Sequence, residues 1–435
     1  MPVPTRRLAL VVAAASLAVF ALPPDGGASL LVVDGLLLAV AVVDGLLAPS
    51  PRRIEVERDL PEVVTLGRSA TVAWRLRNTA GRRAEVLVAD QLAPSLRAGD
   101  RRARVRLTAG GEAVASTTIR PARRGRFEPT DLTVRVTGPL GLVSRQRTRR
   151  LPGLLRVYPP FRSRQEAELR IDQARVLEVG LRSAAGRGGG TDFEQLRDYS
   201  VDDEFRRVDW AASARADRPI VRTYRAERNQ TVLALLDNGR VMAGQVDDVS
   251  RVEHGMDAVM MLTAVATRLG DRAGLVAFDH EVRAIVAPGH GPAQLTRVTE
   301  AMYQLEPALA ESDYEGAFTA TLARFRRRAL LVVITELVES AVGEFLAPAL
   351  PLLSARHLVL VGAVQDPEVL AWARAAPADA EETYRRAAAV AALDERARTA
   401  AQLRALGATV VDAEPGRLAS ELADAYLKVK ATGRL

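Results

Sequence analysis

The chain has 435 residues, of which 48% are hydrophobic, and it contains no cysteine. This length predicts two or three domains, and the hydrophobic content is enough for substantial cores, which excludes global disorder. The lack of cysteine excludes disulfides, Cys-ligated zinc and thiol catalysis. The net charge of +7 makes nucleic acid or an anionic membrane candidate partners. Aromatic residues make up only 4%, too few for base-stacking platforms, so we expect no nucleic-acid partner.

Two apolar segments predict a transmembrane helical hairpin over residues 1–50. The first run covers residues 8–22 and the second covers residues 28–48, which is long enough to span a bilayer. Two pairs of arginines flank the hairpin: Arg6 and Arg7 before it, and Arg52 and Arg53 after it. The loop between the two apolar runs carries no basic residue. By the positive-inside rule, the soluble domains then lie on the cytoplasmic side of the cell membrane. A signal peptide is the alternative for the first run, because its basic start and length fit one.

The second run repeats the hexad Val-Val-Asp-Gly-Leu-Leu, which places Asp34 and Asp44 in an apolar segment. Carboxylates at membrane depth are candidate functional groups. Each lies within about two turns of an end of the span, so we expect water or lipid headgroups to reach both.

Alternating apolar and polar residues predict a β-sandwich over residues 51–160. Val72, Trp74 and Leu76 alternate with polar or small neighbours, and turn residues separate this run from similar short runs. The segment contains no histidine cluster, nucleophile elbow or paired acids. We therefore expect a structural or protein-binding role, with arginines that are solvated or meet anionic lipid.

Residues 161–230 are predicted to form a connector helix followed by a polar segment rich in opposite charges. The glycine-rich stretch 186–190 follows a helix and lacks a Gly-Lys-Ser/Thr sequence, which favours a flexible joint over a phosphate loop. The polar segment after it predicts an ion-pair network, in which arginines bind Asp203 or Asp209, or a partner-binding surface. Its candidate residues are Phe193, Arg197, Tyr199, Asp203, Arg206, Asp209, Trp210 and Arg215.

The same segment resembles the signature of the DUF58 family. That signature has Gly, Phe, Leu-Arg, Tyr, Gly-Asp, Arg and Asp-Trp before Ser-Ala-Arg, and it is matched from Gly190 to Arg215. The sequence departs at Asp202, where the family usually has glycine. The resemblance implies an association with a MoxR-type AAA+ ATPase in a chaperone-like assembly.

Strands and helices alternate through residues 231–435, which predicts a doubly wound, mostly parallel α/β (Rossmann-type) domain. Ligands of such sheets bind beyond the carboxyl ends of the strands. Asp237 ends the first strand there, and later loops carry Ser312 and Glu336. This order resembles a von Willebrand A-like domain, in which an Asp-x-Ser-x-Ser loop, a threonine and an aspartate hold a divalent ion.

The residues of this chain match that metal site poorly. Asp237 corresponds to the first aspartate, Ser312 stands for the threonine, and Glu336 stands for the last aspartate. In the loop Asn238-Gly239-Arg240-Val241, Gly239 and Val241 stand in the two serine positions and offer no side-chain oxygen, and Arg240 is placed to neutralise Asp237. We therefore expect a degenerate metal-ion-dependent adhesion site with no cofactor, and keep Mg²⁺ as the alternative.

No constellation for catalysis is present in the sequence. The four histidines are scattered, and neither Gly-x-Ser-x-Gly nor a Ser-His-Asp arrangement occurs. The expected function is a non-enzymatic, membrane-anchored module that docks a MoxR-type AAA+ ATPase or another envelope protein. The alternative is a Mg²⁺-dependent, adhesion-type receptor.

Overall fold

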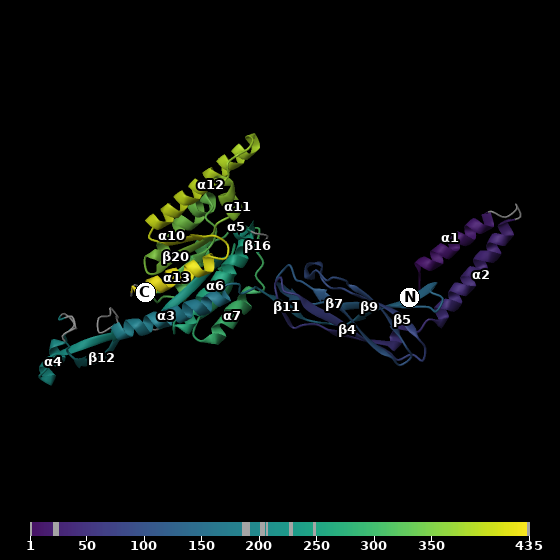
Figure 1. Cartoon of the computed structure of the whole chain (residues 1–435), viewed down its shortest axis with the longest axis horizontal. Helices are drawn as coiled ribbons and strands as arrows, with labels where there is room; N and C mark the ends of the chain where they lie inside the picture. Colours follow the sequence, from purple (N-terminus) through teal and green to yellow (C-terminus); the bar gives the residue numbers. More distant parts are fainter. Residues whose placement is uncertain are drawn as a thin grey trace. The chain divides into compact units, whose positions relative to one another are not determined.

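The computed structural model describes residues 2–20, 26–184, 192–200, 205, 208–225, 229–246 and 249–432. The chain forms two compact units, Met1–Tyr158 and Pro159–Leu435. The first unit contains two N-terminal helices and a β-rich body, and the second contains a sheet with helices on both faces (Figure 1). The predicted multidomain organisation with a β-rich middle is confirmed.

Two apolar helices open the first unit. α1 (Arg6–Phe20) follows the short strand β1 (Pro2–Pro4), and α2 (Gly26–Leu47) leads into the helical turn η1 (Pro51–Arg53). In the described residues, one helix is long and apolar enough to cross a membrane, and it is assigned to Leu31–Arg53. The 15 residues of α1 extend only about 22 Å, which is less than the hydrocarbon core of a bilayer.

The body of the first unit is a set of three sheets. Their strand orders are β1-β10-β9-β5-β6, β2-β4-β7 and β3-β11-β8. The strands are β2 (Ile54–Asp59), β3 (Val63–Thr65), β4 (Ala70–Asn78), β5 (Ala84–Asp90), β6 (Arg102–Leu107), β7 (Glu112–Ile119), β8 (Gly125–Phe127), β9 (Asp131–Thr137), β10 (Val143–Arg150) and β11 (Leu155–Tyr158). The predicted alternation holds in β4, where Val72, Trp74 and Leu76 are buried in the core. Trp74 and Arg58 both donate to the buried carboxylate of Asp90, so this polar group is satisfied.

Asp44 ties the second helix to the β-rich body. Its side chain is fully buried, and its carboxylate accepts hydrogen bonds from the backbone N–H groups of Leu140, Leu142 and Val143 at 2.7–2.9 Å. Thr5, just before α1, donates to the carbonyl oxygens of Gly141 and Leu142 in the same turn. The expectation that water or headgroups reach Asp44 is therefore wrong, because folded backbone supplies the donors that solvent would have provided.

A six-stranded sheet forms the centre of the second unit, in the order β18-β17-β14-β19-β20-β21. All neighbouring pairs are parallel except β17 and β18. The strands are β14 (Thr231–Asp237), β17 (Arg272–Phe278), β18 (Val282–Gly289), β19 (Leu330–Ile334), β20 (Leu358–Val364) and β21 (Thr409–Ala413). Both faces of β14 are buried, since Val232 and Leu236 belong to one apolar core and Leu233 and Leu235 to another.

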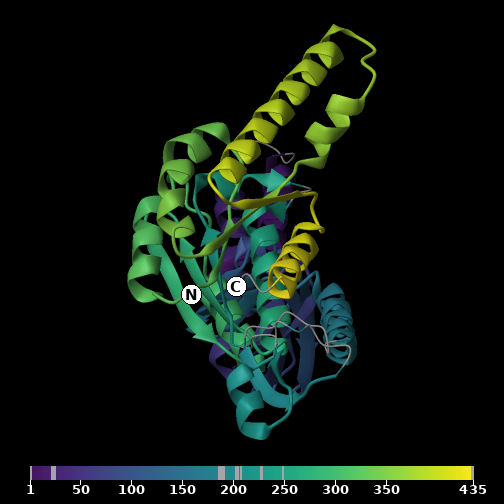
Figure 2. The ribbon, with the colours of Figure 1, turned by 90° about the vertical axis from the view of Figure 1, so that its left-hand side faces the viewer.

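Helices supply those two cores. One face packs against α3 (Arg164–Ala184), α6 (Arg251–Arg268), α7 (Pro292–Met302) and α13 (Leu418–Ala431). The other packs against α8 (Tyr314–Arg324), η5 (Val342–Leu346), α10 (Ala347–Ser354) and the end of α12 (Ala380–Ala405). The remaining short elements are α5 (Arg240–Ala243), β15 (Gln245–Val246), β16 (Val249–Ser250), α9 (Glu339–Ala341) and α11 (Pro367–Arg374). Figure 2 shows the long helix α12 and its neighbour α11 extending together beyond the sheet.

Between α3 and the sheet, the chain forms a smaller element. β12 (Asp192–Asp198) pairs with β13 (Ile220–Arg225) in an antiparallel ribbon, and the short helix α4 (Trp210–Ala216) lies between them in sequence. This ribbon carries the polar segment that the sequence singled out.

Candidate functional site

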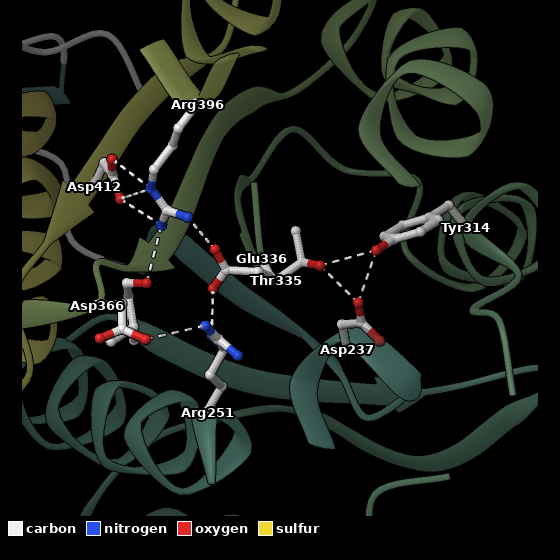
Figure 3. Close-up of polar contacts among 9 residues, drawn as sticks. Asp237, Arg251, Tyr314, Thr335, Glu336, Asp366, Arg396 and Asp412 are labelled. Atoms are coloured by element: carbon white, nitrogen blue, oxygen red, sulfur yellow. Dashed lines mark hydrogen bonds and ion pairs between the residues drawn. The ribbon is translucent and has the colours of Figure 1, made fainter. Parts of the chain in front are cut away.

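The carboxylate of Asp237 lies at the carboxyl end of the central strand β14, fully buried. Its Oδ1 accepts from the Gly239 backbone N–H at 2.8 Å and from the Ser312 hydroxyl at 2.5 Å. Its Oδ2 accepts from the Tyr314 hydroxyl at 2.7 Å and from the Thr335 hydroxyl at 2.6 Å. Figure 3 shows the Tyr314 and Thr335 hydroxyls converging on the same oxygen of the Asp237 carboxylate. Elements distant in sequence are thus joined through one side chain.

These four donors use the whole accepting capacity of the group, because a carboxylate offers about four lone-pair sites. Tyr314 and Thr335 also bond to each other, with 2.8 Å between their oxygens. Burial, and then the negative charge of Asp237, raise the pKa of the Tyr314 phenol well above its ordinary value, so it stays protonated and donating. Asp237 is therefore held by neutral donors.

Arg240 does not neutralise Asp237, contrary to the sequence-based expectation. Its guanidinium pairs with Glu311, and its side chain is 59% exposed. The arginine begins α5 with its side chain toward solvent, whereas the carboxylate lies under the loop. Asn238 contributes to the loop by donating to the Glu306 carbonyl oxygen at 2.7 Å.

The three residues predicted as metal ligands do not come together as a set. Asp237 and Ser312 are in contact, but Glu336 is directed to Arg251 and Arg396 instead. The neighbouring residue Thr335 takes the place that the sequence assigned to Glu336. Sequence reasoning chose Glu336 and not its neighbour Thr335, and it missed the Tyr314 hydroxyl.

The donor set does not fit a divalent cation. It offers a single carboxylate, whereas hard cations are held by several oxygen ligands that are free to coordinate. A Cβ atom at Gly239 would lie 2.1 Å from the Ser312 hydroxyl, so Ser312 fills the space that a serine side chain would need there. In the part of the chain that the structure describes, no group of three or more His, Cys, Asp or Glu side chains could hold a metal.

Glu336 belongs to a second polar network at the same edge of the sheet (Figure 3). Arg396 of α12 pairs with Glu336 and binds Asp412 at 2.7 Å, and Arg251 of α6 lies 3.0 Å from Glu336. Burial opposes the charged form of Arg396, but the hydrogen bonds and negative charges of Asp412 and Glu336 outweigh it and raise the pKa of Arg396. The network joins α12, α6 and the ends of β19 and β21.

A pocket of about 260 Å³ opens beside this network. Its walls mix the charged groups with apolar side chains such as Val338, Val369 and Leu393. Within the described residues, the lining contains no serine, threonine, cysteine or histidine that could act as a nucleophile or imidazole base.

In the polar segment, the structure describes five of the eight candidate side chains. Asp209 caps α4 by accepting from the Ala211 and Ala212 N–H groups at 3.1 and 3.0 Å. Trp210, next to this cap, is 62% exposed. Arg215 donates to the carbonyl oxygen of Ala211 in its own helix.

Arg197 donates to the Asp198 carbonyl oxygen, and the Tyr199 backbone N–H donates to that of Pro219. The side chains of Phe193, Asp203 and Arg206 lie outside the described residues. The predicted ion-pair network therefore stays a prediction for Asp203 and Arg206. For Asp209, the described role is that of a helix cap.

Comparison with protein families places the site and most of the polar segment in one domain. The model of the family described as "Protein of unknown function DUF58" matches residues 195–400. Residues 195–400 belong to the DUF58 family. The DUF58 match includes Asp209, Trp210, Asp237 and Thr335, and it also includes Arg396.

Solved structures that are similar to part of the chain include the CARDB domain of a Pyrococcus furiosus protein, determined by NMR. It is 17% identical, with 24% of this chain and 94% of that chain covered and a TM-score of 0.17. A crystal structure of the same CARDB domain in complex with di-metal ions is 14% identical, covering 26% and 90%, with a TM-score of 0.18. PapD-like domain 7 of human CEP192 is 14% identical, covering 25% and 88%, with a TM-score of 0.18. The comparison with curated proteins gives no match.

Proposed function

We propose that this DUF58 protein is a non-catalytic, membrane-anchored module that docks another protein. In this proposal the C-terminal unit is a von Willebrand A-like domain whose metal position is filled by its own hydroxyl groups. Two observations support the assignment: the central strand β14 ends in a buried aspartate, and a single antiparallel strand, β18, borders an otherwise parallel sheet. The saturated carboxylate of Asp237 supports a structural role for the former metal position.

The observation that carries a docking function is an exposed aromatic pair in the DUF58 segment. Phe205 and Trp210 are 66% and 62% exposed, and their rings meet edge to face with centroids 5.3 Å apart. Large aromatic side chains are costly to leave in water, and they are enriched among the residues that dominate protein interfaces. The Asp209 cap fixes the start of α4 and so presents Trp210 on an ordered element.

We propose a MoxR-type AAA+ ATPase as the partner, in a chaperone-like assembly. The DUF58 match over residues 195–400 supports this partner, because a resemblance to DUF58 implies association with such an ATPase. Another envelope protein is the alternative partner. The pocket beside Glu336 offers a second contact surface at the carboxyl edge of the sheet.

For the membrane, we propose that α1 and α2 cross as a hairpin and leave the soluble domains in the cytoplasm. The helix ends support this topology, because Thr5 before α1 and Asp44 near the end of α2 bind the same turn of the β-rich body. If α2 crosses the bilayer, α1 must then cross back. The 15 residues of α1 are short for a span, so local bilayer thinning or its flanking residues would have to help.

The docking proposal is tested by Trp210→Ala in the full chain, purified from native membranes after cross-linking. Loss of a hot-spot aromatic costs about 2 kcal/mol or more, so recovery of the AAA+ ATPase should fall at least tenfold. Trp372→Ala is the matched control, since Trp372 is an exposed tryptophan in α11, 39% exposed. Equal recovery with both variants, or no AAA+ ATPase with the parent chain, would contradict the proposal.

A Mg²⁺-dependent receptor is the second candidate, and the convergence of Ser312 and Thr335 on Asp237 is the observation that favours it. A ligand that binds only the folded state raises the melting temperature. A rise with millimolar Mg²⁺ or Mn²⁺ that Asp237→Ala abolishes would establish this candidate. No rise is expected, because a cation would have to displace donors that saturate the carboxylate.

A further inference from the structure

Six arginines gather at the end of the β-rich body to which the two helices attach. Arg6 and Arg7 begin α1, and Arg52 and Arg53 end the segment after α2. The backbone carbonyl oxygen of Arg53 accepts from Thr79 at 2.8 Å, which brings the following loop to the same end. That loop carries Arg82 and Arg83, and Asn78 donates to the Arg82 carbonyl oxygen at 2.8 Å. We call this set the arginine collar: Arg6, Arg7, Arg52, Arg53, Arg82 and Arg83.

The collar arginines are exposed, and within the described residues none forms an ion pair with a carboxylate. Among the acids at this end of the body, Glu55 is exposed, and three others are engaged elsewhere. Asp44 accepts from backbone N–H groups, Glu85 pairs with Arg104, and Glu112 pairs with Arg77. The six positive charges of the collar thus outnumber the exposed carboxylate at this end, that of Glu55.

An exposed apolar side chain accompanies the collar. Leu140, 53% exposed, lies in the turn whose N–H groups bind Asp44, and the Arg7 guanidinium lies beside Gly141 in the same turn. A leucine among arginines at the base of an apolar helix matches the boundary between acyl chains and headgroups. Because Asp44 holds this turn to α2, the collar stays at a fixed level relative to the helix end.

We infer that the arginine collar binds the headgroups of anionic phospholipids in the bilayer that holds α2. This inference rests on the proposed membrane anchoring. Clusters of four to eight basic residues beside a span bind anionic lipid, with about 1 kcal/mol for each residue near the surface. Guanidinium groups also match phosphate oxygens bidentately, so they select the headgroup phosphate as well as its charge.

The test uses the full chain reconstituted in phosphatidylcholine vesicles that contain phosphatidylglycerol. Spin-labelled lipids of each kind report the relative association constant of phosphatidylglycerol over phosphatidylcholine at the protein surface. The variant Arg82→Gln with Arg83→Gln removes two collar charges that are distant in sequence from both helices. Its selectivity should fall severalfold, with a limit of roughly fivefold for each arginine at low salt.

The matched control is Arg101→Gln with Arg102→Gln, which removes the same charge at the opposite end of the body, where the carbonyl oxygen of Arg101 accepts from the N–H of Asp90 at the far end of β5. It should keep the parent's selectivity. Equal selectivity in the parent and the Arg82/Arg83 variant, or an equal loss in the control, overturns the inference. Extraction by alkaline carbonate separates the two proposals: a chain that stays in the membrane without lipid preference refutes only the collar, whereas an extracted chain refutes anchoring as well.

Discussion

Asp237→Ala tests whether the buried carboxylate holds the carboxyl edge of the sheet together. In the parent chain it accepts four hydrogen bonds, from Gly239, Ser312, Tyr314 and Thr335. After the substitution, the Tyr314 and Thr335 hydroxyls still bond to each other, but the Gly239 N–H and the Ser312 hydroxyl lose the acceptor described for them. We therefore expect the variant to unfold more readily without any metal present.

The magnitude follows from these two donors. A buried donor left without a partner costs about 1–3 kcal/mol, which gives roughly 2–6 kcal/mol for the pair. Burying the negative charge of Asp237 is itself unfavourable, so removing it offsets part of this cost. We therefore expect a loss of roughly 2–4 kcal/mol, the lower half of that range. For a unit of this size the melting temperature should fall by about 4–12 °C.

The measurement is a thermal melt of the full chain in detergent with EDTA, followed by intrinsic fluorescence. Asp313→Ala is the matched control, because Asp313 caps α8 through the Gly316 N–H and its loss should cost only about 1 kcal/mol. The reasoning is refuted if Asp237→Ala melts within about 1 °C of the parent in EDTA. A difference that develops only when Mg²⁺ is added would point to a metal ligand instead.

Three further outcomes are expected. Asp44→Ala should increase amide exchange in the turn at residues 140–143, since three backbone N–H groups lose their acceptor; the exposed Asp34 of the first hexad copy is the control. Burial, then the charges of two nearby arginines, lower the pKa of His357, so the unfolded chain binds a proton that the folded chain resists. Its contribution to stability is present above the ordinary histidine pKa and is lost as pH falls below it, and His357→Leu should reduce the slope of unfolding free energy against pH. Arg396→Leu should cost about 3–5 kcal/mol in chemical denaturation, because Asp412 loses its ion-pair partner and Glu336 keeps only Arg251, whereas Arg385→Leu on the exposed face of α12 should cost little.

The sequence predicted many of the elements because their hydrophobic periods are strong. The apolar runs at residues 329–334 and 358–361 of the sequence overlap β19 and β20, and the alanine-rich stretch at residues 379–406 coincides with α12. The role of Asp44 could not be predicted in this way. Its donors lie 96–99 residues away, and both copies of the hexad are identical in sequence.

The sequence predicted part of the site, but it could not predict which side chains after β19 face Asp237. Thr335 and Glu336 both follow β19, and successive side chains at a strand end face opposite sides. Only the register of the sheet decides that Thr335 meets Asp237 while Glu336 meets Arg396. Tyr314 lies two residues after Ser312, and this spacing was the available signal for a polar role.

The edge strand β1 has a consequence for the order in which the first unit folds. Residues 2–4 are synthesised first, yet they pair with β10 at residues 143–145, so the sheet cannot be completed until some 140 residues have followed. From the time β10 is made until β1 pairs with it, the free edge of β10 offers unpaired backbone groups to other chains. The helical hairpin lies between the two partners in sequence, and β1 reaches its place only when that hairpin has closed. In the proposed membrane topology, insertion of the hairpin and completion of the sheet are therefore coupled steps, and a hairpin that fails to insert leaves an edge exposed to aggregation.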